Sequence, residues 1–438
     1  MQKRKQADFS PIEQRRPRLR QRREDSSSAG SLVVQPDHAL ESLGERQPFR
    51  YQELDPTKRS VRLLQVHPGQ PVDEIRCSLL CFNLDTEPKY QALSYMWDHD
   101  SEKKTILCNG MSLSVGGSLW TFLLEYRKTC SQDDWLWIDA VCINQVDVRE
   151  RNHQVAQMYE IYSEASSVII WLGGANPHDR QAFQELETYH AYYNAQAPAE
   201  RLKDWRILLH NYEVRGALGR WRPWNSWYYL FRKPYWRRIW IIQEVVTAKT
   251  VNIWCGDLRA DADDFKRAGD GANGVHEIRD TPGWRLLQLR SSWQTRHEES
   301  PPSTFSLRSL STSFATSDST DPRDFVYALL GIAVDASGQS HCLVADYSKS
   351  AAEVVADVAR IVFHLQMPEL KGYQDSFGGS AIQEVEDFVW TSEKMESNFI
   401  YHLMSKLGVH GQDGDEVMHC MYRARAERIL PLARVQSE

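Results

Sequence analysis

Carboxylate and amide side chains gather directly after a short apolar run near the middle of this 438-residue chain. The run Trp135–Ile138 stops at Asp139, and Asn144 and Gln145 follow in the polar loop AVCINQVD. A second apolar run, Val168–Leu172, comes after an amphipathic stretch, which is the pattern of a βαβ unit with parallel strands. Ligands of open parallel sheets bind beyond the carboxyl ends of the strands, so these polar groups are candidates for contacts with a ligand.

The stretch between the two runs predicts a helix with one buried face, because apolar residues recur at the helical period. These residues are Val155, Met158, Tyr159, Tyr162 and Ala165. The pattern Asp147-x-x-Glu150-Arg151 opens this helix, where acidic side chains complement the helix dipole. We expect Asp147 to be the N-cap residue.

Other elements follow from similar patterns. Apolar runs predict strands at 61–66, 75–82 and 250–255, and a hairpin at 105–115 that turns at Asn109–Gly110. Helices are predicted at 118–127 and at 235–248. The second of these helices carries Glu244, which enters the argument below.

Composition limits the class of protein. A hydrophobic content of 42% with 15 Trp is enough for a large folded core. The sequence has no run of about twenty apolar residues and no apolar leader, so we expect an intracellular protein without a membrane span. The 8 Cys contain no C-x-x-C pair, and Cys77 and Cys81 share one face of a predicted strand, which favours core thiols over a metal site.

Charge is unevenly distributed along the chain. The net charge is −7, yet residues 1–25 carry nine Lys and Arg against four Asp and Glu. The acidic remainder argues against general nucleic-acid binding by the folded part. The basic runs within Lys3–Arg23 have the layout of a bipartite nuclear-import signal, or they form a solvated disordered arm, so a cytoplasmic or a nuclear location is open.

Five separated segments, in the right order along the chain, carry a resemblance to a known family. The central stretch WLWIDAVCINQVDVRERNHQVAQMYEIYSEASSVIIWLG resembles the central motif of the fungal heterokaryon incompatibility (HET) domain. YQALSYMWD (Tyr90–Asp98) and YWRRIWIIQEVVTAKTVNIWCG (Tyr235–Gly256) are similar to its opening strand and its closing motif. Asp321–Ala333 and Ala345–Arg360 resemble segments that follow the domain in many members. One position departs from the family pattern, because Asp98 stands where Gly is usual.

The resemblance suggests a division of the chain. Residues 1–48 would be a disordered basic tail, 49–295 the HET domain, and 296–322 a Ser/Thr-rich loop or linker. Residues 323–370 would be a helical extension, and 371–438 match no pattern that we can assign.

The HET domain is in turn similar in outline to TIR domains, which implies the fold class. We expect an α/β fold with a TIR/flavodoxin-like parallel sheet flanked by helices, followed by a helical C-terminal extension. The first three strands would be Tyr90–Trp97, Leu136–Asp139 and Val168–Leu172. We predict that the strand ends Ser94–Asp98 and Asp139–Gln145 lie side by side.

The TIR resemblance also implies a chemistry. Several TIR domains cleave NAD at the nicotinamide–ribose bond, and Glu244 stands at the position of their catalytic Glu. A carboxylate there would stabilise the oxocarbenium character that develops on the ribose, while nicotinamide leaves as a neutral group. Trp97 would stack on a base or on nicotinamide. The remaining candidate substrate-binding residues are Ser94, Tyr95, Asp139, Asn144 and Gln145.

Two functional hypotheses remain open from the sequence. One is an NAD glycohydrolase, with NAD as substrate and no cofactor, that drives cell death in fungal non-self recognition. The other is a non-catalytic signalling module that acts through self-association or through an unknown incompatibility or sensor partner. In the second case Glu244 would be a structural ion-pair partner of a nearby cation.

Overall fold

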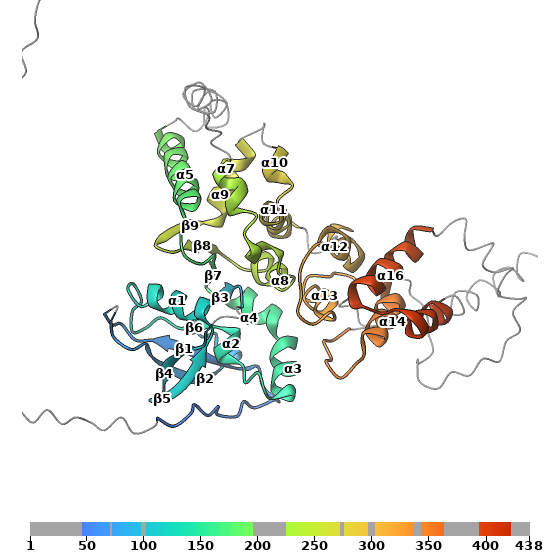
Figure 1. Ribbon diagram of the computed structural model, residues 1–438, viewed down its shortest axis with the longest axis horizontal. Coiled ribbons are helices and arrows are strands. Elements are labelled where there is room, and N and C mark those ends of the chain that lie inside the picture. Colours follow the sequence, from blue (N-terminus) through green and yellow to red (C-terminus); the bar gives the residue numbers. More distant parts are fainter. Residues whose placement is uncertain are drawn as a thin grey trace, which may run out of the picture. The chain divides into compact units, whose positions relative to one another are not determined.

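The computed structural model describes residues 46–70, 72–97, 102–195, 225–271, 276–296, 303–336, 343–362 and 394–421. In these ranges the strands form one mixed sheet in the order β5-β4-β2-β1-β6-β3-β7-β8-β9 (Figure 1). The strands are β1 (Ser60–Val66), β2 (Arg76–Asn83), β3 (Gln91–Tyr95), β4 (Lys104–Cys108), β5 (Met111–Val115), β6 (Leu136–Trp137), β7 (Ser167–Trp171), β8 (Val251–Cys255) and β9 (Leu258–Asp261).

The middle of this sheet is parallel, which confirms the α/β class. Strands β6, β3, β7 and β8 run in one direction, and their order follows the flavodoxin-like arrangement in which the second strand along the chain lies outside the first. Gln91 pairs with Leu136, so β3 and β6 are neighbours and their carboxyl ends lie side by side as predicted. The whole sheet is mixed, because β1 and β9 are antiparallel to their parallel-core neighbours. Asp98 lies outside the described residues.

The strand sequences explain their positions. All five residues of β7 are buried, as a parallel strand covered on both faces requires. The hairpin of β4 and β5 turns at Asn109 (φ 51°) and Gly110 (φ 77°), a left-handed pair that only a few residue types adopt easily. Cys77 is buried on β2, but Cys81 is exposed, so the prediction of two core thiols was half wrong.

Helices occupy much of the remaining described chain. They are α1 (Gly117–Tyr126), α2 (Asp139–Cys142), α3 (Val148–Ala156), α4 (Met158–Glu164), α5 (Pro177–Ala195), α7 (Asn225–Leu230), α8 (Ile241–Val246), α9 (Ala262–Gly271), α10 (His276–Arg279), α11 (Pro282–Gln294), α12 (Leu307–Ser313), α13 (Asp324–Tyr327), α14 (Ala351–Val362) and α16 (Lys394–Leu407). Short 3-10 turns are η1 (Leu84–Thr86), η2 (Pro234–Arg237) and η3 (Ser303–Phe305).

The single helix expected after β6 is divided in two. Helix α3 ends at Ala156, Gln157 leaves helical geometry (φ −98°, ψ 4°), and α4 begins at Met158. A buried side chain from another helix favours the break. In the amide orientation that satisfies both of its ends, Gln243 accepts a hydrogen bond from the Tyr159 N–H (2.6 Å) and donates to Ala328 O (3.2 Å). Of the predicted buried face, Met158, Tyr162 and Ala165 are buried, whereas Val155 and Tyr159 are half-buried.

The helix predicted at 235–248 is also interrupted. The 3-10 turn η2 ends at Arg237, Arg238 is extended, and α8 begins only at Ile241. The reason is a short parallel bridge to a distant segment, in which Asp318 N donates to Arg237 O (2.6 Å) and Ile239 N donates to Asp318 O (3.0 Å). The helical periodicity of the sequence cannot reveal this bridge, because Asp318 lies eighty residues after Arg238.

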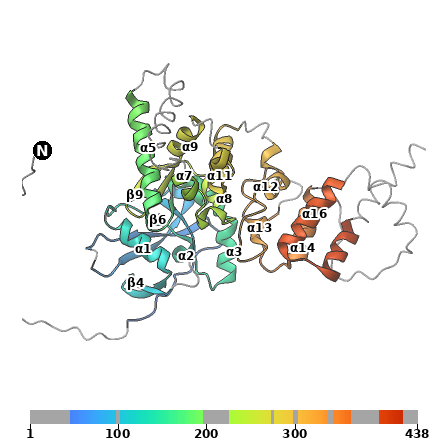
Figure 2. The same ribbon diagram turned by 45° about the horizontal axis from the view of Figure 1, so that its top comes forward.

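Part of the Ser/Thr-rich segment is helical, contrary to expectation. Helix α12 lies within 296–322, Ser306 caps it, and its Leu307 and Leu310 are fully buried. Beyond it, α14 and α16 pack against each other, and both views show them side by side (Figures 1 and 2). Helix α16 falls in the segment 371–438 that the sequence left unassigned.

Gly283 allows α11 to approach η2 closely. A Cβ at this position would lie 2.8 Å from both Phe231 Cδ1 and Trp236 Cδ2, two buried rings with no room to move. We therefore expect Gly283→Ala to lower the free energy of unfolding by about 1–3 kcal/mol through overpacking. Thermal and urea unfolding would measure the change. Gly174→Ala is the control, because no atom lies within 4 Å of its added Cβ, and an equal loss in both variants would contradict the packing argument.

Candidate functional site

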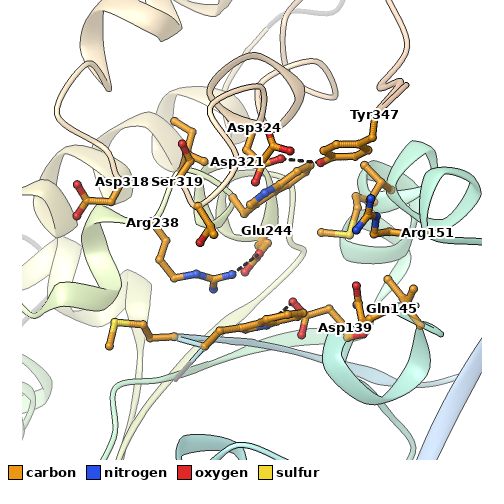
Figure 3. A pocket seen from close by; sticks show the side chains of 18 residues that line it. Asp139, Gln145, Arg151, Arg238, Glu244, Asp318, Ser319, Asp321, Asp324 and Tyr347 are labelled. Atoms are coloured by element: carbon orange, nitrogen blue, oxygen red, sulfur yellow. Dashed lines mark hydrogen bonds and ion pairs between the residues drawn. The ribbon is translucent and has the colours of Figure 1, made fainter. Parts of the chain in front are cut away.

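A cavity of about 470 Å³ lies beyond the carboxyl ends of β3 and β6. Four of the residues predicted from the sequence line it, namely Trp97, Asp139, Gln145 and Glu244. Its size falls in the usual range of roughly 300–1,000 Å³ for small-molecule sites. Figure 3 shows Arg238 and Glu244 directed toward one another in the cavity, whereas Asp318 points away from them.

Glu244 reaches the cavity from α8 and is only 1% exposed. The Ser94 hydroxyl donates to Glu244 Oε2, and it shares a second hydrogen bond of 2.6 Å with the Tyr235 hydroxyl. Since the Ser94 proton is directed to Glu244, Tyr235 is the donor in that second bond. A chain of hydroxyl groups therefore leads from Tyr235 through Ser94 to the carboxylate.

Arg238 is the cation that faces this carboxylate, and sequence reasoning assigned it no site role. Its NH2 lies 3.9 Å from Glu244 Oε1, and its NH1 donates to the backbone oxygen of Tyr95 at the end of β3 (Figure 3). The break in the helix before α8 places it there, because extended backbone at Arg238 separates it from the helical residues that follow. In the sequence, the only indication of this contact was the pair of adjacent arginines. A continuous helix would have directed both of them away from Glu244.

Burial dominates the electrostatics of Glu244. Removal of the carboxylate from water, together with the nearby charge of Asp139, raises the pKa of Glu244 to about 7, although Arg238 and the Ser94 hydroxyl act in the opposite direction. Burial also raises the pKa of Asp139, against the effects of Arg238, the Ala140 N–H and Trp97. Two carboxylates with perturbed pKa values around one cavity are typical of a functional site.

Asp139 is the first residue of α2 and holds the opposite wall together. Its Oδ2 accepts from Trp97 Nε1 (2.9 Å), its Oδ1 accepts from Ala140 N (2.7 Å), and its backbone oxygen accepts from Gln145 Nε2 (2.9 Å). The indole of Trp97 is thereby fixed at the edge of the cavity. These bonds join the ends of β3 and β6 into one surface.

Three predicted substrate-binding residues do not line the cavity. Ser94 lies beneath it in contact with Glu244, and the side chain of Tyr95 is buried in the core. Asn144 lies in the loop after α2, and its backbone N–H donates to Glu150 Oε1 (2.6 Å). Ser94 and Tyr95 therefore position the residues around the cavity, Ser94 through its hydroxyl on Glu244 and Tyr95 through its backbone oxygen on Arg238.

Segments far along the chain complete the cavity. Asp318, Ser319, Thr320, Asp321, Asp324 and Tyr347 line it together with Arg151, Arg238 and Trp240. The first six come from 318–347, which sequence analysis placed in a linker and a helical extension. The sequence did link Asp321–Ala333 and Ala345–Arg360 to the family, because they resemble segments that follow the HET domain. That resemblance did not predict that residues of these segments line the cavity. Among the described residues, no group of His, Cys, Asp and Glu is placed to hold a metal ion.

A buried ion pair supports the loop below the cavity. Arg62 donates to both carboxylate oxygens of Glu150 (2.6 and 2.9 Å) and to Cys142 O (2.9 Å), and the Arg62 side chain is 2% exposed. Glu150 therefore forms an ion pair, a role beyond the expected complement to the helix dipole. Asp147 does cap α3, accepting from Arg149 N (2.9 Å) and Glu150 N (3.2 Å).

These two acids should differ in their effect on stability. Glu150→Ala leaves the buried Arg62 charge uncompensated, so we expect a loss of about 3–5 kcal/mol in the free energy of unfolding. Asp147→Ala removes only a cap and should cost about 0.5–2 kcal/mol. Urea unfolding of both variants would compare them, and a cost for Glu150→Ala no larger than that for Asp147→Ala would refute a structural ion pair.

Comparison with known proteins agrees with the sequence motifs. Residues 90–244 match the model of the heterokaryon incompatibility protein (HET) family. The chain is 27% identical over 391 residues to heterokaryon incompatibility protein 6, OR allele, of Neurospora crassa, and the match covers 77% of this chain. It spans 55% of that relative, little more than half its length. No solved structure matches. Residues 90–244 of this chain are therefore similar to the HET family of fungal incompatibility proteins.

The family match ends at Glu244 and therefore includes only part of the cavity. It contains Trp97, Asp139, Arg151, Arg238 and Glu244, whereas the lining residues of 318–347 lie beyond it. In the described part of the chain, no helix has the length and apolar character needed to cross a membrane.

Proposed function

We propose that this chain acts in fungal heterokaryon incompatibility and that its cavity hydrolyses the nicotinamide–ribose bond of NAD, a reaction that would drive cell death by depleting the cofactor. The family match and the name of the Neurospora relative support the incompatibility role. The observation that carries the chemistry is the environment of Glu244. It is a buried carboxylate that titrates near neutral pH, and it lines a cavity with Arg238, Asp139 and Trp97.

The reaction needs few protein groups. As the C–N bond breaks, the bonding electrons leave with nicotinamide, which departs neutral, and positive charge develops on the ribose. The ionised Glu244 would stabilise this oxocarbenium character in a site where water is partly excluded. Water then adds to the ribose carbon and loses a proton, which gives ADP-ribose.

The surrounding residues have matching roles in this proposal. Asp139 and Gln145 offer polar groups to the ribose hydroxyls at the end of β6, and the fixed indole of Trp97 offers a flat surface to the nicotinamide ring. Arg238 lies 3.9 Å from Glu244 and favours its ionised form, although burial raises the pKa of the carboxylate to about 7.

Replacing the carboxylate is the direct test. Glu244→Gln keeps the size of the side chain but removes its charge, so we expect NAD cleavage to fall by at least about 100-fold. Chromatography of nicotinamide and ADP-ribose released by purified protein would measure this, and expression in fungal cells would measure toxicity. Glu187→Gln, at an exposed position of α5, is the control and should retain full activity.

The result separates the enzyme from a non-catalytic module. Near-UV circular dichroism must show that the Glu244→Gln variant keeps native packing. A folded variant that still cleaves NAD would exclude Glu244 as the essential carboxylate. A wild-type protein that kills cells without releasing nicotinamide would exclude the hydrolase, and self-association or partner binding would then explain its action.

The pKa of Glu244 predicts a pH dependence. The reaction needs the ionised form, so kcat/KM should rise about tenfold per pH unit below pH 7 and level off above it, because the pKa of Glu244 is about 7. The Ser94 hydrogen bond lowers that pKa, so Ser94→Ala should move the midpoint to higher pH. A rate that is flat from pH 5 to 9 would contradict a titrating Glu244.

A further inference from the structure

Two arginines line the cavity, and they differ in what they contact. Arg238 already has partners within the protein, because it contacts Glu244 and donates to Tyr95 O. Arg151, from the second turn of α3, lies elsewhere on the cavity wall, and Figure 3 shows Glu244 between the two guanidinium groups. Within the described residues, the side chain of Arg151 makes no hydrogen bond, and no carboxylate lies within 4.0 Å of its guanidinium, whereas its backbone N–H donates to Asp147 O within the helix (2.9 Å). Its Nε is buried and has no partner.

The aromatic ring of Tyr347 holds Arg151 in position. The Arg151 Cζ lies 5.0 Å from the ring centroid, within range of a cation–π interaction. This contact holds the guanidinium against the ring and uses none of its N–H donors in a hydrogen bond. Arg151 therefore presents an oriented charge with unused donors on the wall of a cavity.

The nearby carboxylates do not neutralise this charge. Asp321 accepts two hydrogen bonds from Arg323 at 2.6 and 2.9 Å, so its charge is already paired. Asp324 accepts from the Tyr347 hydroxyl (2.6 Å), and burial raises its pKa. Asp318 pairs with Arg237 outside the cavity (3.0 Å). Among the described residues that line the cavity, Arg151 is therefore a cation whose guanidinium forms no ion pair.

We propose that Arg151 binds a phosphate group of the ligand. A guanidinium offers parallel N–H donors that match two oxygens of one phosphate, and such charge-assisted pairs are strong where water is partly excluded. This inference rests on the proposed function when it names the phosphate as the diphosphate of NAD. The ligand would then place its diphosphate at Arg151 and its nicotinamide–ribose bond at Glu244.

Binding of ADP-ribose tests the assignment without requiring turnover. Isothermal titration calorimetry should show ADP-ribose binding to the wild-type protein, and Arg151→Gln should weaken it about 10- to 100-fold. Arg151→Lys keeps the charge but loses the paired donors, so its affinity should lie between the two. Arg149→Gln is the matched control, because Arg149 is exposed on the same helix and should bind like the wild type.

Steady-state kinetics give a second readout. Loss of a contact that is equally strong in the ground and transition states raises KM and leaves kcat unchanged, so Arg151→Gln should raise KM alone. Nicotinamide riboside, which lacks phosphate, should be cleaved equally by both proteins. Inorganic pyrophosphate should compete with ADP-ribose in the wild type if the phosphate alone supplies the contact.

The outcomes separate this inference from the proposed function. Unchanged ADP-ribose affinity in a folded Arg151→Gln variant, or no binding of ADP-ribose and pyrophosphate to the wild type, would overturn the phosphate contact. Arg151-dependent binding in a protein that cleaves no NAD would support the contact while the hydrolase proposal fails. Cleavage of NAD with an unaltered KM in Arg151→Gln would refute the contact and leave the hydrolase proposal intact.

Discussion

Arg238 and Glu244 place opposite charges next to the carboxyl end of β3, where bulk water cannot fully solvate either group. Withdrawing such ions from water costs several kcal/mol each, and their attraction offsets this only when other polar groups complete their solvation. Here the Ser94 hydroxyl donates a hydrogen bond to Glu244, and the Tyr95 carbonyl accepts one from Arg238. The ion pair therefore depends on the residues of β3 that lie directly below it. Burial outweighs this contact of 3.9 Å, so the pKa of the carboxylate is raised to about 7.

This arrangement depends on a contact between distant segments. Arg238 reaches Glu244 because the backbone at Arg237–Ile239 pairs with Asp318 and so cannot continue a helix. The same segment then supplies Asp321 and Asp324 to the cavity wall. The region after the HET family match is thus part of the architecture of the site. Its acidic residues are compensated locally, which keeps the cavity from becoming strongly negative.

Much of the fold could be predicted from the sequence, because its signals are local. Continuous apolar runs identified the central strands, since a strand covered on both faces must be apolar throughout. Asn109–Gly110 identified the hairpin, because few residue pairs tolerate two positive φ angles. The strand-end rule correctly placed Asp139 beside the end of β3, and the family motif pointed to Glu244 as the acid that faces it.

Other features were decided only by tertiary structure. The breaks at Gln157 and Arg238 arise from partners outside the local sequence, so the helical period could not predict them. Ser94 and Tyr95 proved to support the site, Ser94 through its hydroxyl and Tyr95 through its backbone oxygen, because helix α8 and Arg238 pack against the end of β3. Arg151 is one charge among many in the sequence. Only the folded chain pairs the carboxylates around it with other groups and places Tyr347 against it. The sequence thus determined which residues could do chemistry, and long-range packing decided which of them meet in one cavity.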